Sequence, residues 1–195
     1  MYKQLTSGLI IALSSYSHAS PEVSLVQLGA LLSDNNPSVE RRLSIYLNDR
    51  SGYFRAHENN LWERGIENPR GITTEIALID SLIESGSLVY ADFAMEADQV
   101  MIMLDKAYGN TLSEQACFRN LIRAYSELGP MNVIANFLYN EDIGPMPMNC
   151  ITSSGYMLAS IDEGSDAYAF VLVERSDNDL FSRLASDANV KVKIH

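Results

Sequence analysis

The chain has 195 residues, 47% of them apolar and 20% charged, a composition typical of a globular domain and not of a disordered or fibrous chain. This length suits one domain with a sizeable core and is short for two. The formal net charge of −11 argues against nucleic acid as a partner, because phosphate binding requires clustered lysine and arginine.

Residues 1–20 form an N-terminal extension with two alternative interpretations. Leucines recur every four residues from Leu5 to Leu13, which is typical of an amphipathic helix. The apolar run at 9–13 followed by Ser17-His18-Ala19 is also the pattern of a signal peptide, although its apolar core is short. We favour a retained helix in a cytoplasmic protein, whereas cleavage would indicate export to the periplasm. No other segment approaches the roughly 18 apolar residues of a membrane span.

Residues 21–139 show mainly the periodicity of helices. Thr111-Leu-Ser-Glu114 has the pattern of a capping box, which would start its helix. Residues 141–154, with two prolines, are expected to form the longest loop. The spacing predicts helices over 21–32, 37–47, 73–85, 95–108, 111–128 and 130–139, a short-helical or irregular stretch at 51–71, and a strand at 87–93.

The C-terminal part predicts strands. Gly155–Ile161 and Ala167–Glu174 are apolar on both faces, as central strands of a covered sheet are. A helix follows residues 176–179, and Val190–Ile194 alternates apolar residues with lysines, which is typical of an edge strand. We therefore predict an α+β fold in one domain, 21–195: a helix-rich N-terminal two thirds packed on a small, mostly antiparallel sheet with a C-terminal β-β-α-β unit.

The segment between the two apolar strands, Ile161-Asp-Glu-Gly-Ser-Asp-Ala-Tyr168, could be a calcium loop or a turn. Calcium loops place oxygen ligands at alternate positions and end with a carboxylate at the twelfth. Counted from Asp162, the third residue is Gly164 and the twelfth is Val173, so the pattern fails. We expect a structural turn at Gly164 and Ser165, because glycine supplies a positive φ and the polar side chains bond nearby backbone.

The two cysteines, Cys117 and Cys150, have no nearby cysteine or histidine that would make a zinc-ligand spacing. Buried free thiols are the default, and a disulfide between them is an alternative only for an exported protein. From these patterns we expect neither a metal nor a cofactor.

Catalytic groupings are sparse. Of the three histidines, His18 lies in the N-terminal extension and His195 is the last residue, so a nucleophile–histidine pair depends on His57. A hydrolase that uses paired carboxylates is the alternative, with Asp92, Asp162 and Asp166 near predicted strand ends as its catalytic candidates. Such pairs arise easily by chance among 25 acidic residues, and a catalytic role is therefore not favoured.

Recognition of a protein partner has more support. Residues 58–105 hold ten carboxylates against Arg64 and Arg70, a local net charge of −8, which indicates solvated helix faces or a surface that steers a basic partner. Trp62 and Arg64 belong to the residue types enriched at interface hot spots. Met146 and Met148 flank a proline in the expected loop and are candidates for an exposed apolar contact.

The chain resembles an uncharacterised bacterial family, a domain of unknown function, over roughly residues 24–195. The resemblance rests on Trp62-Glu-Arg-Gly-Ile66, on the stretch from Ala77-Leu-Ile-Asp80 to Asp92, and on Leu158–Tyr168 with the helix and strand that follow. Members of that family more often have a tryptophan and a basic residue after the strand aspartate, where this chain has Phe93-Ala94, so a function tied to those positions does not transfer. The Gly-Ser-Asp-x-Tyr hairpin is also similar in composition to the SUKH superfamily, which includes toxin-immunity proteins.

We therefore expect a non-enzymatic acidic binding or regulatory module, immunity-like, for a basic protein partner. The alternatives are the carboxylate-dependent hydrolase and a small-ligand module with a pocket between the helices and the sheet.

Overall fold

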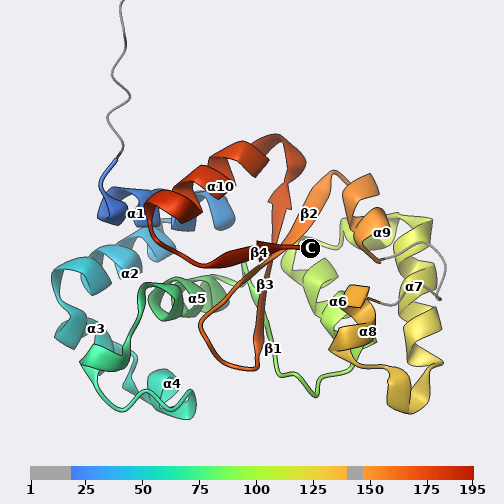
Figure 1. The fold of residues 1–195 in the computed structure, drawn as a ribbon, viewed down its shortest axis with the longest axis horizontal. Coiled ribbons are helices and arrows are strands. Elements are labelled where there is room, and N and C mark those ends of the chain that lie inside the picture. The colour runs from blue at the N-terminus through green and yellow to red at the C-terminus, as the bar shows by residue number, and fades with distance from the viewer. Residues whose placement is uncertain (1–18, 140–146) are drawn as a thin grey trace, which may run out of the picture.

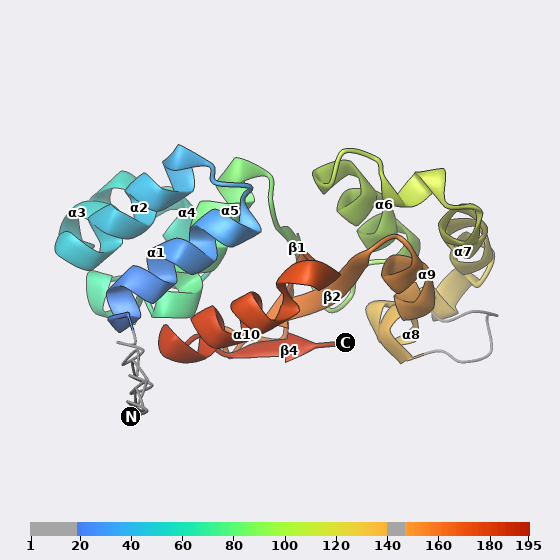
Figure 2. The same cartoon turned by 90° about the horizontal axis from the view of Figure 1, so that it is seen from above.

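The computed structural model describes residues 19–139 and 147–195, which place helices on both faces of one antiparallel sheet (Figures 1 and 2). The sheet contains β1 (Val89–Ala91), β2 (Tyr156–Ile161), β3 (Tyr168–Glu174) and β4 (Val192–Ile194) in the order β1-β3-β2-β4. Every pairing is antiparallel. With α10 (Asn178–Asp187) between β3 and β4, the C-terminal β-β-α-β unit and the predicted α+β class are confirmed.

One face of the sheet is covered by α10 and the N-terminal helices. Two of these helices begin at side-chain caps followed by proline in the first turn: Ser20 accepts a hydrogen bond from the Val23 amide, and Asn36 accepts one from the Ser38 amide. Ala159, Val171 and Val173 contribute the sheet's side of this first core. The helices are α1 (Pro21–Leu32), α2 (Pro37–Asn48), α3 (Arg50–Ala56), α4 (Glu58–Glu63) and α5 (Thr74–Ser85).

A second core fills the opposite face. Leu158, Phe170 and Leu172 point into it, and they alternate along β2 and β3 with the residues of the first core. Both central strands are therefore covered on both sides, as their continuous apolar runs predict. The helices on this face are α6 (Ala97–Ala107), α7 (Ala116–Ser126), α8 (Ile134–Tyr139) and α9 (Pro147–Ser153). None of the helices in the described ranges combines the length and apolar character needed to cross a bilayer.

The capping box predicted at residues 111–114 is wrong. The Thr111 hydroxyl donates to the Tyr108 carbonyl at 3.0 Å, so it does not cap a new helix. Asp105 Oδ1 accepts from the Ser113 amide at 2.9 Å and holds Leu112–Glu114 in a 3₁₀ turn. The helix α7 consequently begins at Ala116, five residues after the predicted start.

The expected long loop also contains a helix. Residues 147–153 form α9, with Pro147 at its first position, where the missing amide proton costs nothing. Cys150 and Ile151 on this helix are buried in the second core. The predicted strand at 87–93 is shorter than expected, because only Val89–Ala91 pair with β3.

The turn between β2 and β3 has the chemistry that its residues indicate. Gly164 has a φ of +85°, and its amide donates to Asp162 Oδ1 at 2.9 Å. The Ser165 hydroxyl oxygen accepts from the Ala167 amide at 3.2 Å and donates to Glu163 Oε1 at 3.0 Å. Local side-chain bonds thus close the turn and fix the register of the two central strands.

Candidate binding groove

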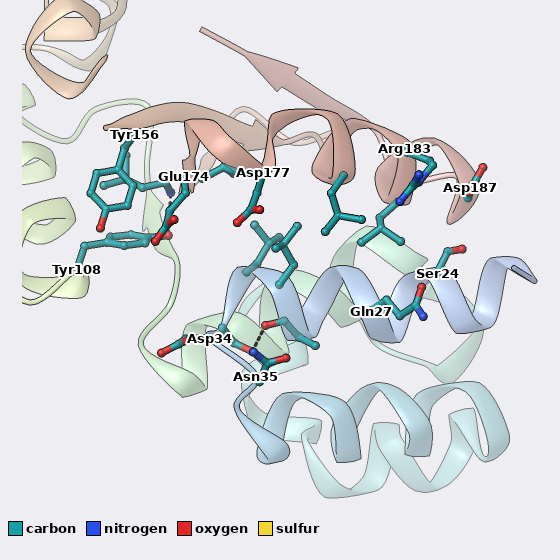
Figure 3. Close-up of a pocket in the computed structure, with 18 of the residues that line it drawn as sticks. Ser24, Gln27, Asp34, Asn35, Tyr108, Tyr156, Glu174, Asp177, Arg183 and Asp187 are labelled. Atoms are coloured by element: carbon teal, nitrogen blue, oxygen red, sulfur yellow. Dashed lines mark hydrogen bonds between the residues drawn. The ribbon is translucent and has the colours of Figure 1, made fainter. Parts of the chain in front are cut away.

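A groove of about 1200 Å³ lies between α1, α10 and the end of the sheet where β2 begins and β3 ends (Figure 3). Its apolar base includes Leu31 from α1 and Leu180 and Leu184 from α10. These two helices bring together parts of the chain separated by about 150 residues, and both pack on the first core. The groove therefore follows from the fold and has no counterpart in a local sequence motif.

Two tyrosines form one end of the groove (Figure 3). The Tyr108 hydroxyl accepts from the Leu172 amide at 2.7 Å and donates to the Ser87 carbonyl at 3.0 Å. Burial raises the pKa of Tyr108 to about 12, so this hydroxyl stays protonated near neutral pH. The ring of Tyr156 lies 6.1 Å from that of Tyr108, centroid to centroid, and is tilted by 58°. The end of the groove is thus an aromatic wall fixed by strand backbone.

The rim of the groove is acidic. Four carboxylates and one guanidinium line it, which gives a local net charge of −3. These residues come from separate parts of the chain: the turn after α1, the end of β3, the 3₁₀ turn that follows β3, and α10. The acidic rim residues are Asp34, Glu174, Asp177 and Asp187, and the basic one is Arg183. A surface of this kind attracts cationic groups.

Ser24 on α1 lines the groove and is fully buried, and its Oγ has no hydrogen-bond partner among the described residues. Leaving a buried hydroxyl unpaired costs roughly 1–3 kcal/mol. Its side chain lies between α1 and α10, on the same side as Gln27 (Figure 3).

The predicted binding residues lie elsewhere. Trp62 on α4 is 59% exposed, whereas Arg64 forms an ion pair with Glu163 and covers the Tyr90 ring at 5.1 Å from the centroid. Met148 on α9 packs against the second core, and Met146 falls outside the described residues. Trp62, Arg64 and Met148 all lie outside the lining of the groove.

The three suspected catalytic aspartates lie toward the other end of the sheet. Asp92 follows β1, while Asp162 and Asp166 belong to the β2–β3 turn. Asp92 Oδ1 accepts from the Ala94 amide at 2.8 Å, and Asp162 Oδ1 accepts from the Gly164 amide, so both carboxylates serve their own turns. They do not line the groove.

The acidic segment 58–105 does not supply the groove's charge either, since all four rim carboxylates come from outside it. Two of its own carboxylates, those of Asp80 and Asp105, are buried. Counting charge along the chain therefore missed the acidic surface that the fold assembles. The strand register could have indicated this end of the groove, because pairing Tyr156 with Glu174 places an aromatic and an acidic side chain together at one end of the hairpin.

The histidines also differ from expectation. His195, the residue after β4, has its Nε2 2.9 Å from Oγ of Ser160 on β2, so a serine–histidine pair does not depend on His57. Burial, with a smaller effect of Lys193, lowers the pKa of His195 to about 4. Burial also lowers the pKa of His57, an effect that Asp80 opposes and Arg42 reinforces. Both imidazoles are consequently neutral near pH 7.

The two cysteines are free thiols, Cys150 buried and Cys117 half-buried. Burial and the neighbouring Cys117 raise the pKa of Cys150 to about 12. A thiol with so high a pKa is a poor nucleophile at neutral pH, because the thiolate is the reactive form.

Comparison with known proteins adds no functional information. No family model matches the chain, no curated protein is significantly similar to it, and no solved structure matches its fold. The resemblance to an uncharacterised bacterial family therefore stays a prediction, and functional argument depends on the groove itself.

Proposed function

We propose that this protein is a non-enzymatic binding or regulatory module whose groove holds a basic segment of a protein partner. The observation that carries the proposal is the combination of a leucine base with an acidic rim in one groove. The corresponding biological role would be immunity-like: the groove would bind the basic segment of a harmful partner and so block that partner's activity.

An amphipathic basic segment matches both parts of the groove. Its apolar side chains would contact the base formed by Leu31, Leu180 and Leu184, while its lysines or arginines would face the rim. The groove volume of about 1200 Å³ exceeds the roughly 300–1,000 Å³ of small-molecule pockets, which favours a peptide segment over a small ligand. The hydrolase alternative gains no support here, because its aspartates lie outside the groove.

The test is a binding experiment with the full chain, in which fluorescence anisotropy measures how much peptide is bound. The probe is a labelled helical peptide of leucine and lysine, and its counterpart has glutamate in place of lysine. Wild-type protein is expected to bind the lysine peptide and not the glutamate peptide. Asp177→Lys should slow association and weaken affinity by about tenfold at low salt, because a rim charge acts mainly on the approach of a charged partner.

Asp179→Lys is the matched control, since it makes the same charge change two residues away, in the first turn of α10 and outside the groove, whereas Asp177 immediately precedes that helix. It should retain most of the affinity for the lysine peptide. If Asp179→Lys weakens binding as much as Asp177→Lys does, net charge alone attracts the peptide and the groove is not its site. No binding of the lysine peptide at low salt would contradict the proposal outright.

A further inference from the structure

A second cluster of polar side chains lies among the N-terminal helices, and none of its three members lines the groove. His57 stands at the junction of α3 and α4, while Asp80 and Glu84 are one turn apart on α5 and share its face. One ligand atom from each side chain, an imidazole nitrogen and two carboxylate oxygens, lies within 4.8 Å of the other two. Residues distant in sequence thus converge on one point.

Each carboxylate in this cluster is held by an outer partner. The Tyr53 hydroxyl donates to Asp80 Oδ2 at 2.7 Å, and the Arg42 guanidinium forms an ion pair with Glu84 Oε2. Glu84 Oε1 remains directed at the inside of the cluster, 3.3 Å from His57 Nδ1. Metal-binding carboxylates and imidazoles are typically oriented by such outer hydrogen bonds, and those bonds are already present here.

The negative charge of the cluster is only partly compensated. Asp80 is only 3% exposed, and its hydrogen-bond partner is a neutral hydroxyl. Burying a carboxylate is costly unless a cation compensates it. Arg42 pairs with Glu84, so it compensates one of the two carboxylates. A further positive charge between Asp80 and Glu84 would balance the second.

Access from solvent is provided by a cavity of about 310 Å³, which reaches two of the three side chains, His57 and Glu84, but not Asp80. Its other lining residues are Arg42, Arg55, Ala56, Glu58, Asn59 and Asn60. A cation could enter through it and keep a water molecule on that side. The cluster therefore has protein ligands on its inner side and room for solvent on its outer side, as metal sites with an open coordination position do.

From this arrangement we infer that His57, Asp80 and Glu84 bind one divalent transition-metal cation. Zn²⁺ matches best, because one imidazole and two carboxylates are ligands it accepts, with a water in the fourth position. Mg²⁺ matches poorly, since it prefers oxygen ligands only. Small rotations of the three side chains would bring the ligand atoms to coordination distance. This site is separate from the groove and does not depend on the function proposed for it.

The experiment is calorimetric titration of ZnCl₂ into the full chain after removal of metal with a chelator. Wild-type protein should take up one equivalent of Zn²⁺ with micromolar or tighter affinity, and MgCl₂ should not compete. His57→Phe keeps an aromatic ring against Tyr53, whose centroid lies 4.6 Å from that of His57, but removes the nitrogen ligand. It should weaken Zn²⁺ binding by at least about tenfold.

His195→Phe is the matched control, because it removes the other histidine of the described residues and leaves this cluster intact. It should bind Zn²⁺ like wild type. Co²⁺ substitution distinguishes the sites further: the spectrum should lack a thiolate charge-transfer band, which binding at Cys117 or Cys150 would produce. Circular dichroism of each metal-free variant shows whether it folds, and Glu84→Gln replaces His57→Phe if that variant does not.

Three results would overturn the inference. The first is that wild-type protein shows no stoichiometric Zn²⁺ binding. The second is that the folded His57 or Glu84 variant binds Zn²⁺ as tightly as wild type, and the third is a thiolate band in the Co²⁺ spectrum. Each would leave the cluster as a structural network of Tyr53, Arg42 and the three proposed ligands.

Discussion

At the scale of single residues, Gly164 shows how one backbone conformation fixes a turn. Its φ of +85° lies in the left-handed region that side chains with a branched Cβ rarely adopt. A Cβ at this position would meet no atom within 4 Å, so any cost of substitution comes from the backbone itself.

We therefore expect Gly164→Val to lower the free energy of unfolding by about 1–3 kcal/mol, measured by urea denaturation. Gly164→Asn should cost clearly less, because asparagine tolerates the left-handed region. Equal losses for the two variants, or an unchanged valine variant, would show that the turn does not require this conformation.

Local chemistry made the role of Gly164 predictable, since an Asp-Glu-Gly-Ser segment between two strands indicates a turn on its own. The same reasoning could not reveal Ser160 beside His195, which are 35 residues apart and meet through strand pairing. Ser24 was likewise invisible, because a serine on a helix gives no sign that α10 will cover it. Residue roles that depend on tertiary neighbours need the fold first.

At the scale of elements, Arg64 ties the segment after α4 to the sheet. Its guanidinium pairs with Glu163 of the β2–β3 turn and lies over the ring of Tyr90 on β1. The Tyr90 hydroxyl also hydrogen-bonds to Glu163. The side chain of Glu163 is only 6% exposed, and Arg64 supplies the positive charge that accompanies its hydrogen bonds from Tyr90 and Ser165.

Removing Arg64 alone should be strongly destabilising, since it leaves a buried carboxylate without its cation. We expect Arg64→Ala to cost about 3–5 kcal/mol in the free energy of unfolding, measured by chemical denaturation. The double variant Arg64→Met with Glu163→Gln should recover most of that loss, because no buried charge remains. A double variant as unstable as the single one would mean that packing, not charge, is what Arg64 contributes.

The existence and type of most elements could be predicted from periodicity, because burial of one helix face or both strand faces leaves a direct pattern. The boundaries of these elements could not be predicted where a residue suits two different local structures. Thr111 caps nothing because its hydroxyl bonds backward to Tyr108, and Pro147 begins α9 although proline is also a loop residue. The choice between such uses is made by contacts that a single segment does not contain.

At the scale of the whole molecule, the central strand β3 joins the two cores. Phe170 belongs to the second core and Val171 to the first, although they are neighbours in sequence. Both side chains are fully buried. Displacing this strand would therefore loosen the packing of both helical layers together.

We expect Phe170→Ala to lower the free energy of unfolding by about 3–5 kcal/mol, as large-to-small core substitutions do, in a single transition. Hydrogen exchange should show reduced protection in α5 and in α7 alike. Val171→Ala is the comparison from the other face and should also affect both layers. Loss of protection confined to the layer that each side chain contacts would show that the two cores unfold independently.

The strand order has a consequence for how a partner can bind. The outer strands β1 and β4 pair over only three residues each, and β4 carries exposed Lys193. Proteins that recognise a partner by adding its strand to their sheet need a long free edge for main-chain hydrogen bonds. Short edges with a lysine discourage that mode and also discourage aggregation. A partner of the kind proposed above would therefore be bound mainly through side chains, and its sequence would matter more than its ability to form a strand.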